Sequence, residues 1–260
     1  KQFFHKRIKK RGDILFSFFV TYCILESSRK NPERSFALKT KKKDLLNKVI
    51  PSWAVIPLFT ILAVNCLIYW GSSALTAGRY HYDFTMAIDR AVPLLPGFVW
   101  IYILAFPFWA AGYVLAAKRG KDMFYRFVAT DLTIHFICFI CFVLIPTTNV
   151  RPQLAGNTVS EKVLQLVYSL DGGNSPSNLF PSIHCYVSWM CWKAVAGSKK
   201  IPGWYQVFSL VFAVLIIVST QVLKQHYIVD AIVALVLVEI FWRFYQKGQR
   251  HRWVCKIFKI

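Results

Sequence analysis

Long apolar runs dominate the chain between residues 50 and 248. A helix that crosses the hydrocarbon core of a membrane needs about 20 mostly apolar residues. The fourth run is the shortest, which is expected if its first turn lies below the headgroups and contributes to a site. The pattern predicts an all-α fold, a polytopic bundle of six transmembrane helices at about Trp53–Leu75, Leu94–Ala117, Phe124–Ile145, Pro181–Gly197, Trp204–Leu223 and Tyr227–Tyr245.

The remaining residues form a basic arm and a basic tail. Residues 1–49 contain one apolar run, Ile14–Leu25, which is too short to cross a bilayer. We predict that this arm forms an amphipathic helix at the cytoplasmic membrane interface, with its lysines over anionic lipid headgroups; a plain cytoplasmic extension is the alternative. We therefore expect three regions: the interfacial arm 1–49, the transmembrane domain 50–248 and a cytoplasmic tail 249–260. The chain begins with Lys1 and shows no cleavable signal pattern, so we expect residues to be missing before it.

The positions of the basic residues predict the orientation in the membrane, because Lys and Arg are concentrated in cytoplasmic loops. Here they gather in residues 1–49, at Lys118–Lys121, at Lys199–Lys200 and from Arg243 onward. We therefore expect both termini in the cytoplasm of a bacterial cell, with the protein in the cell membrane. The loop 147–180 and the turn before the sixth helix then lie on the extracytoplasmic face.

Composition and charge exclude several function classes. Hydrophobic residues make up 56% of the chain, above the roughly 45–50% of soluble domains. The net charge of +20 sits in short blocks at helix ends, which favours anionic lipid as a partner and argues against nucleic acid. Cys138 and Cys141 have the spacing of a zinc or redox pair but lack a second pair, so we expect no metal and no cofactor. No pattern indicates an oligomeric state.

A polar segment, Ser175–His184, leads into the fourth apolar run. Proline suits the first turn of a helix, so we expect this helix to begin at about Pro181. The backbone amides of Ser182, Ile183 and His184 would then point out of the helix start without partners. Free amides at a helix N-terminus, with a hydroxyl and an imidazole beside them, are typical of a phosphate site.

His226 and Asp230 are four residues apart at the start of the sixth run, so we expect them to share a helix face. A carboxylate fixes the tautomer of a neighbouring imidazole and prepares it to react. We expect His226 to attack phosphorus, and His184 to protonate the leaving oxygen and then activate water. Arg151 would hold the phosphoryl oxygens. The alternative for each residue alone is a polar side chain that faces water at the membrane interface.

Three stretches resemble the signature motifs of the type 2 phosphatidic acid phosphatase (PAP2) superfamily: Arg151-Pro152, Pro181-Ser182-Ile183-His184 and Ser219-x6-His226-x3-Asp230. The resemblance covers about residues 140–235. It implies metal-independent phosphoester hydrolysis through a phosphohistidine. It further implies that His226 is the nucleophile supported by Asp230, that His184 is the acid, and that phosphate is bound by Arg151 and Ser182.

The chain departs from the family pattern at three positions. The family has a lysine seven residues before the arginine of its first motif, where this chain has Leu144. It has an arginine after the serine of its third motif and a glycine before the histidine of its second, where this chain has Thr220 and Ile183. Lys224 lies one helical turn beyond Thr220 and is a candidate to replace a missing cation; a lysine that extends to the headgroups is the alternative. We expect the substrate to contact Arg151, Ser182, Ile183 and Lys224.

These motifs support three hypotheses about function. The first is an integral-membrane lipid phosphatase that acts at the extracytoplasmic face on a lipid phosphate, such as phosphatidic acid, phosphatidylglycerol phosphate or an isoprenyl diphosphate. The stretch Lys224–Asp230 is also similar to the HYxxD pattern of sphingomyelin and inositol-phosphorylceramide synthases, so the second is a phosphotransferase that passes a phospho-headgroup to a lipid alcohol. The third is a non-catalytic lipid-binding relative, which Leu144 and Thr220 favour.

Overall fold

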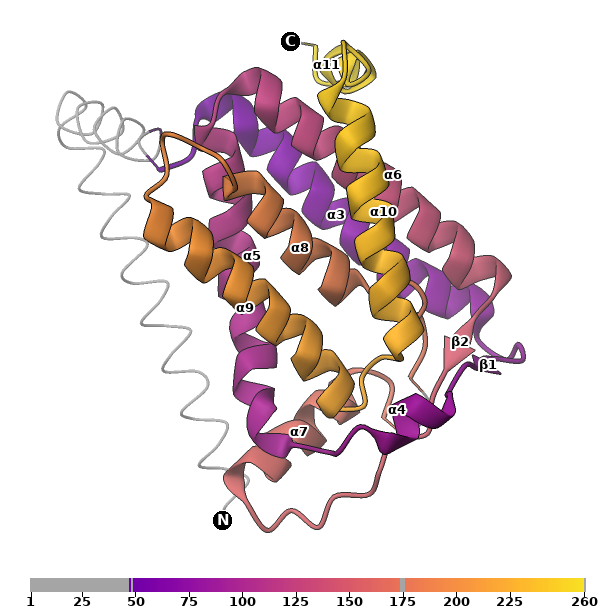
Figure 1. Ribbon diagram of the computed structural model, residues 1–260. Coiled ribbons are helices and arrows are strands. Elements are labelled where there is room, and N and C mark those ends of the chain that lie inside the picture. Colours follow the sequence, from indigo (N-terminus) through magenta and orange to yellow (C-terminus); the bar gives the residue numbers. More distant parts are fainter. Residues whose placement is uncertain (1–46, 48, 174–175, 260) are drawn as a thin grey trace, which may run out of the picture. The chain divides into compact units, whose positions relative to one another are not determined.

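A computed structural model describes residues 47, 49–173 and 176–259. The chain divides into two compact units, Lys1–Pro51 and Ser52–Ile260, and the second unit is described here. The amphipathic helix expected within residues 1–49 lies outside the described residues. The second unit is built almost wholly from helices, as the apolar runs predict (Figure 1).

Four helices of this unit are long and apolar enough to cross a membrane: α3 (Ser52–Thr76), α5 (Val99–Lys118) with the preceding 3-10 turn η1 (Pro96–Phe98), α6 (Lys121–Leu144) and α9 (Gly203–Val222). They coincide with the first, second, third and fifth predicted spans. A helix suits such a run in lipid, because all of its backbone hydrogen bonds lie within the one segment.

The other two predicted spans are helices, but they do not meet the same criteria, so the count of six is not confirmed. Helix α8 (Ile183–Val195) has 13 residues, which is about 20 Å of helix against a hydrocarbon core of about 30 Å. Helix α10 (Ile228–Gln246) is long enough but carries Asp230, Glu239 and Arg243. Helix α8 packs inside the bundle, where it contacts α5, α6, α9 and α10, whereas α10 packs on α6 and α8 and leaves an apolar face exposed (Figure 1).

The polar connections gather at one end of the bundle. The strands β1 (Tyr82–Asp83) and β2 (Thr147–Thr148) form a short parallel pair, a small exception to an all-α fold. The amide of Leu95 donates to the carbonyl of Val222 at 3.0 Å. These contacts join the connections that follow α3 and α6 to the end of α9. The short helices α4 (Ala87–Ala91) and α7 (Val159–Leu170) lie at the same end of the bundle (Figure 1).

The basic connections lie at the opposite end. Arg119 donates to the carbonyl of Ala194 at 2.9 Å, and Arg126 donates to that of Tyr245 at 2.7 Å. Within the predicted tail, α11 (Arg252–Ile257) packs on α6. Of the segments that were assigned to one membrane side from their charge, the three within the described unit therefore share one end of the bundle.

Candidate active site

His226 lies in the connection between α9 and α10, two residues before the helix begins, and Asp230 is in the first turn of α10. The carboxylate of Asp230 accepts from the amide of Tyr227 at 3.0 Å and lies 3.2 Å from Nδ1 of His226. The carbonyl of Leu179 lies 3.0 Å from the same nitrogen. Two acceptors at Nδ1 require a hydrogen on it, so Nε2 of His226 carries the free lone pair.

His184 lies in the first turn of α8, and the start of this helix differs from the expectation. The helix begins at Ile183, not Pro181, because Ser182 caps it: its Oγ accepts from the amide of Cys185 at 3.3 Å. The amide of Ser182 donates to the carbonyl of Asp230 at 3.3 Å. The prediction that the amide of Ser182 is free to bind an anion is therefore wrong. This amide instead links the start of α8 to the first turn of α10.

The two imidazoles lie side by side, with ring centroids 5.8 Å apart. The ring of His184 stacks on Tyr102 at 4.6 Å and meets the edge of Trp109 at 5.1 Å, so aromatic side chains of α5 fix its orientation. Its Nε2 is buried and has no hydrogen-bond partner among the described residues. A reacting group is normally held about 3–3.5 Å from its catalytic groups, so both rings can contact the same phosphoryl group.

Both histidines line a cavity of about 360 Å³, which we call the aromatic cavity. Among the described residues, no lysine or arginine lines it. Trp70 and Phe106 at its rim are 68% and 55% exposed, so it opens on the side of the bundle between α3 and α5. Ile183, a predicted substrate contact, is among the residues that line it, together with Asn65, Tyr69, Tyr102, Trp109, Asp171 and Asn178.

Arg151 is buried, but its terminal nitrogens are already paired. Nη1 donates to the carbonyls of Tyr168, Asp171 and Gly173 at 2.8–3.1 Å. Nη2 donates to the Asp171 carboxylate and, at 2.6 Å, to Oε1 of Gln225. Arg151 therefore caps the carboxyl end of α7, where a positive charge is favourable. Arg151 does not line the aromatic cavity. It could bind a phosphate in that cavity only if its contacts with the carbonyls, Asp171 and Gln225 were broken.

Lys224 also contacts carbonyls. Its backbone has φ of 53°, and its Nζ donates to the carbonyl of Asp89 at 2.6 Å and to that of Val92. Burial lowers the pKa of this ammonium, while the nearby Asp89 carboxylate opposes the shift. That carboxylate in turn accepts from the amide of Ile228 at 2.8 Å. Lys224 thus fastens the connection that carries His226 to the end of α4.

Leu144 and Thr220 stand at the two positions where the family has a lysine and an arginine, and neither side chain is charged. Leu144 ends α6 and is 66% exposed. Thr220 is fully buried, and its Oγ1 donates to the carbonyl of Ile217 at 2.7 Å. No cluster of three or more His, Cys, Asp or Glu that could hold a metal ion occurs in the part of the chain that the structure describes.

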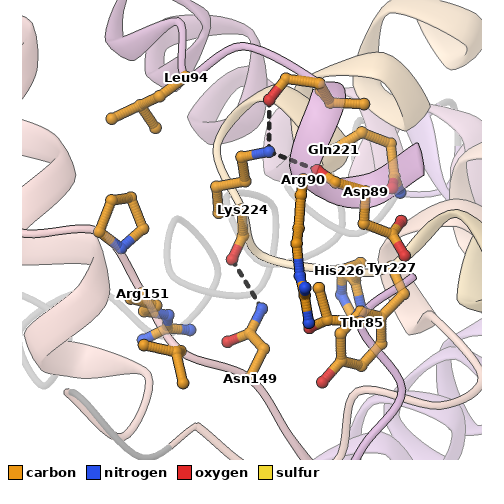
Figure 2. Close-up of a pocket in the computed structure, with 13 residues that line it drawn as sticks. Thr85, Asp89, Arg90, Leu94, Asn149, Arg151, Gln221, Lys224, His226 and Tyr227 are labelled. Carbon is orange, nitrogen blue, oxygen red and sulfur yellow. Dashed lines mark hydrogen bonds between the residues drawn. The ribbon is translucent and has the colours of Figure 1, made fainter. Parts of the chain in front are cut away.

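His226 also lines a second cavity, of about 300 Å³, which we call the polar cavity (Figure 2). It contains side chains that the sequence analysis did not select, notably Arg90 of α4 and Asn149 after β2. Neither belongs to a recognisable motif. The only signal for Arg90 is a charged pair, Asp89-Arg90, in a connection between two apolar runs.

Residues 87–244, more than half of the chain, match the family described as PAP2 superfamily. Neither the curated proteins nor the solved structures include a match, and the similarity to sphingomyelin and inositol-phosphorylceramide synthases is therefore not shown. The family match and the four apolar helices together indicate a membrane protein with a phosphatase-type function.

Proposed function

Because the chain belongs to the PAP2 superfamily, we propose that it is an integral-membrane phosphatase that hydrolyses a lipid phosphate monoester or diphosphate through a phosphohistidine at His226. One observation carries this proposal. Nδ1 of His226 faces both Asp230 and the Leu179 carbonyl, which leaves Nε2 as a nucleophile beside the second imidazole.

The reaction follows from the two imidazoles. Nε2 of His226 attacks phosphorus, the bond from phosphorus to the lipid oxygen breaks, and that oxygen takes a proton from His184. His184 then accepts a proton from water, whose oxygen attacks the phosphohistidine. The bond from phosphorus to nitrogen breaks, and inorganic phosphate is released with His184 protonated again. Asp230 stabilises the positive charge that develops on His226.

The aromatic cavity suits the lipid part of the substrate. Its rim residues Trp70 and Phe106 are exposed on the outer surface of the bundle, where acyl or prenyl chains of the bilayer would lie. A tail can enter from this side while its phosphate reaches the histidines. The substrate classes are those with a terminal phosphate on an apolar tail. We place the site at the extracytoplasmic face and both termini in the cytoplasm, where the basic segments would contact anionic lipids.

A second candidate is transfer of the phosphoryl group to a lipid alcohol. The observation that favours it is the lining of the aromatic cavity: no lysine or arginine among the described residues and several large aromatic rings. Such a lining holds a second lipid better than it holds water. The first steps are the same in both candidates, which differ only in the acceptor.

The test uses purified protein in lipid nanodiscs and a panel of phosphatidic acid, phosphatidylglycerol phosphate and an isoprenyl diphosphate. We expect phosphate release and an acid-labile label on the protein from ³²P-lipid, and both are expected to disappear in His226→Ala. His81→Ala is the matched control, because His81 lies at the same end of the bundle and lines neither cavity.

The outcomes separate the hypotheses. A labelled lipid product that forms only when a lipid alcohol is added would replace hydrolysis with transfer. Activity near wild type in His226→Ala would overturn both. If no lipid gives a product or a labelled protein, the result would favour the third hypothesis, a non-catalytic lipid-binding protein.

A further inference from the structure

The polar cavity holds cationic side chains close to His226, but two of its charged residues are engaged elsewhere. The ammonium of Lys224 donates to the carbonyls of Asp89 and Val92. The Asp89 carboxylate accepts from the amides of Met86 and Ile228, both at 2.8 Å. These groups hold the short helix α4 against the start of α10, so neither charge is available to a ligand.

Arg90 is different. It lines the polar cavity together with His226, and its side chain is exposed. Among the described residues, its guanidinium makes no hydrogen bond and no ion pair with a carboxylate. Figure 2 shows the side chain extending from α4 along the cavity, toward the part lined by Asn149 and His226. The carboxylate of Asp83, in the same connection, accepts from the amide of Thr85 and from the hydroxyl of Tyr227. Burial raises the pKa of this carboxyl, but these hydrogen bonds and the positive charge of Arg90 lower it, so Arg90 acts on Asp83 only through space.

The proposed reaction is favoured by a cation near His226. A phosphoryl group bears negative charge that increases in the transition state, and preorganised positive groups stabilise it. The aromatic cavity supplies no lysine or arginine from the described residues, and Arg151 is paired with Asp171. A phosphoryl group at His226 can extend its non-bridging oxygens into the polar cavity, because His226 lines both cavities.

We propose that Arg90 binds the phosphoryl group of the substrate from the polar cavity and supplies the positive charge that Leu144 and Thr220 do not. This inference rests on the proposed function and extends it by one residue and one anion-binding site. A guanidinium presents two parallel N–H donors to phosphate oxygens, a geometry that an ammonium cannot reproduce. The carbonyls at the carboxyl end of α4 are contacted by Lys224, so the guanidinium of Arg90 is not needed for that contact.

The test compares Arg90→Gln and Arg90→Lys with Lys162→Gln, which removes one positive charge from the exposed face of α7 and lines neither cavity. Two measurements are made in nanodiscs: kcat/KM for phosphate release, and binding of orthovanadate followed by ⁵¹V NMR. Vanadate serves as the probe because it mimics the phosphoryl transition state.

We expect Arg90→Gln to lower kcat/KM and weaken vanadate binding, each by about 10- to 100-fold, as for loss of a charge-assisted hydrogen bond. Arg90→Lys should recover only part of both, and Lys162→Gln should match wild type. The melting temperature should not change in Arg90→Gln, since the side chain is exposed.

The results distinguish this inference from the proposed function. If wild type releases phosphate and Arg90→Gln is equally active and binds vanadate as well, Arg90 is a solvated surface residue and the inference is wrong. If no lipid is hydrolysed but vanadate binding still depends on Arg90, the anion site stands and the proposed function fails. Loss of vanadate binding equally in Lys162→Gln would show a general charge effect and would also overturn the site.

Discussion

The role assigned to Asp230 can be tested with Asp230→Asn, a change that keeps the size of the side chain and removes its charge. In the wild-type protein the backbone amide of Tyr227 donates to the Asp230 carboxylate at 3.0 Å. The amide oxygen of the substituted side chain can still accept this hydrogen bond. The first turn of α10 should therefore remain capped. What is lost is the charge-assisted contact to Nδ1 of His226, which lies 3.2 Å away.

The size of the effect follows from the second acceptor at that nitrogen. Nδ1 of His226 lies 3.0 Å from the carbonyl of Leu179, closer than it lies to Asp230. That carbonyl keeps the hydrogen on Nδ1 and so preserves the reactive tautomer. Only the stabilisation of the positive imidazole is removed, about 1.5–3 kcal/mol for a hydrogen bond to a charged group. At 1.36 kcal/mol for each factor of ten, kcat should fall about 10- to 150-fold.

The assay is kcat for phosphate release at saturating lipid, with the melting temperature of each variant. Asp122→Asn is the control, since this exposed carboxylate lies at the opposite end of the bundle in a pair with Arg126. An unchanged kcat would refute the support of His226 by Asp230. A loss of a thousandfold or more in a fully folded variant would refute the role of the Leu179 carbonyl in holding the tautomer.

Three further changes test the fold that holds the site. Gly112→Ala should destabilise the protein by about 1–3 kcal/mol in thermal unfolding, because a Cβ there would lie 2.7 Å from the Cβ of a cysteine on α8; Gly71→Ala, with open space around it, should not. Lys224→Met should lower kcat together with the melting temperature, because it frees the end of α4 that holds the connection bearing His226; loss of vanadate binding with unchanged stability would contradict this positioning role. Arg151→Lys should lower the melting temperature, since one ammonium cannot satisfy three carbonyls, the Asp171 carboxylate and a glutamine; an unchanged melting temperature with weaker lipid binding would instead favour direct contact of Arg151 with phosphate.

The long helices were predictable because apolar length alone identifies them. Helices α3, α5, α6 and α9 fall close to the runs that predicted them. The start of α8 was predicted less well, because proline and serine both occur near helix starts. The serine at position 182 caps the helix through its Oγ, and Pro181 therefore lies outside it. Which of the two residues begins the helix depends on the hydrogen bond between Ser182 and Asp230 of α10, and the local sequence does not predict that contact.

The pairing of His226 with Asp230 was also predictable, but for a different reason from the one given by helix periodicity. His226 precedes α10, so the two residues do not share a face of a helix. They meet because a carboxylate in the first turn of a helix turns back toward the residues before it, as Asp230 does to the amide of Tyr227. The spacing of four residues therefore predicted the contact correctly, although the assumed helical geometry was wrong.

The partners of the cations could not be predicted from sequence, because they are backbone carbonyls brought close by tertiary packing. Arg151 caps the end of α7, Lys224 caps the end of α4, and Nη1 of Arg79 donates to the carbonyl of Val143 near the end of α6. The carboxyl end of a helix carries a partial negative charge, which a nearby cation offsets. All three basic side chains are thus committed to helix ends, and two of them, Arg151 and Lys224, are the ones that the sequence motifs assign to phosphate. A phosphoryl group at His226 must then draw its positive charge from the imidazoles and from a cation outside the motifs, and Arg90 is placed to supply it.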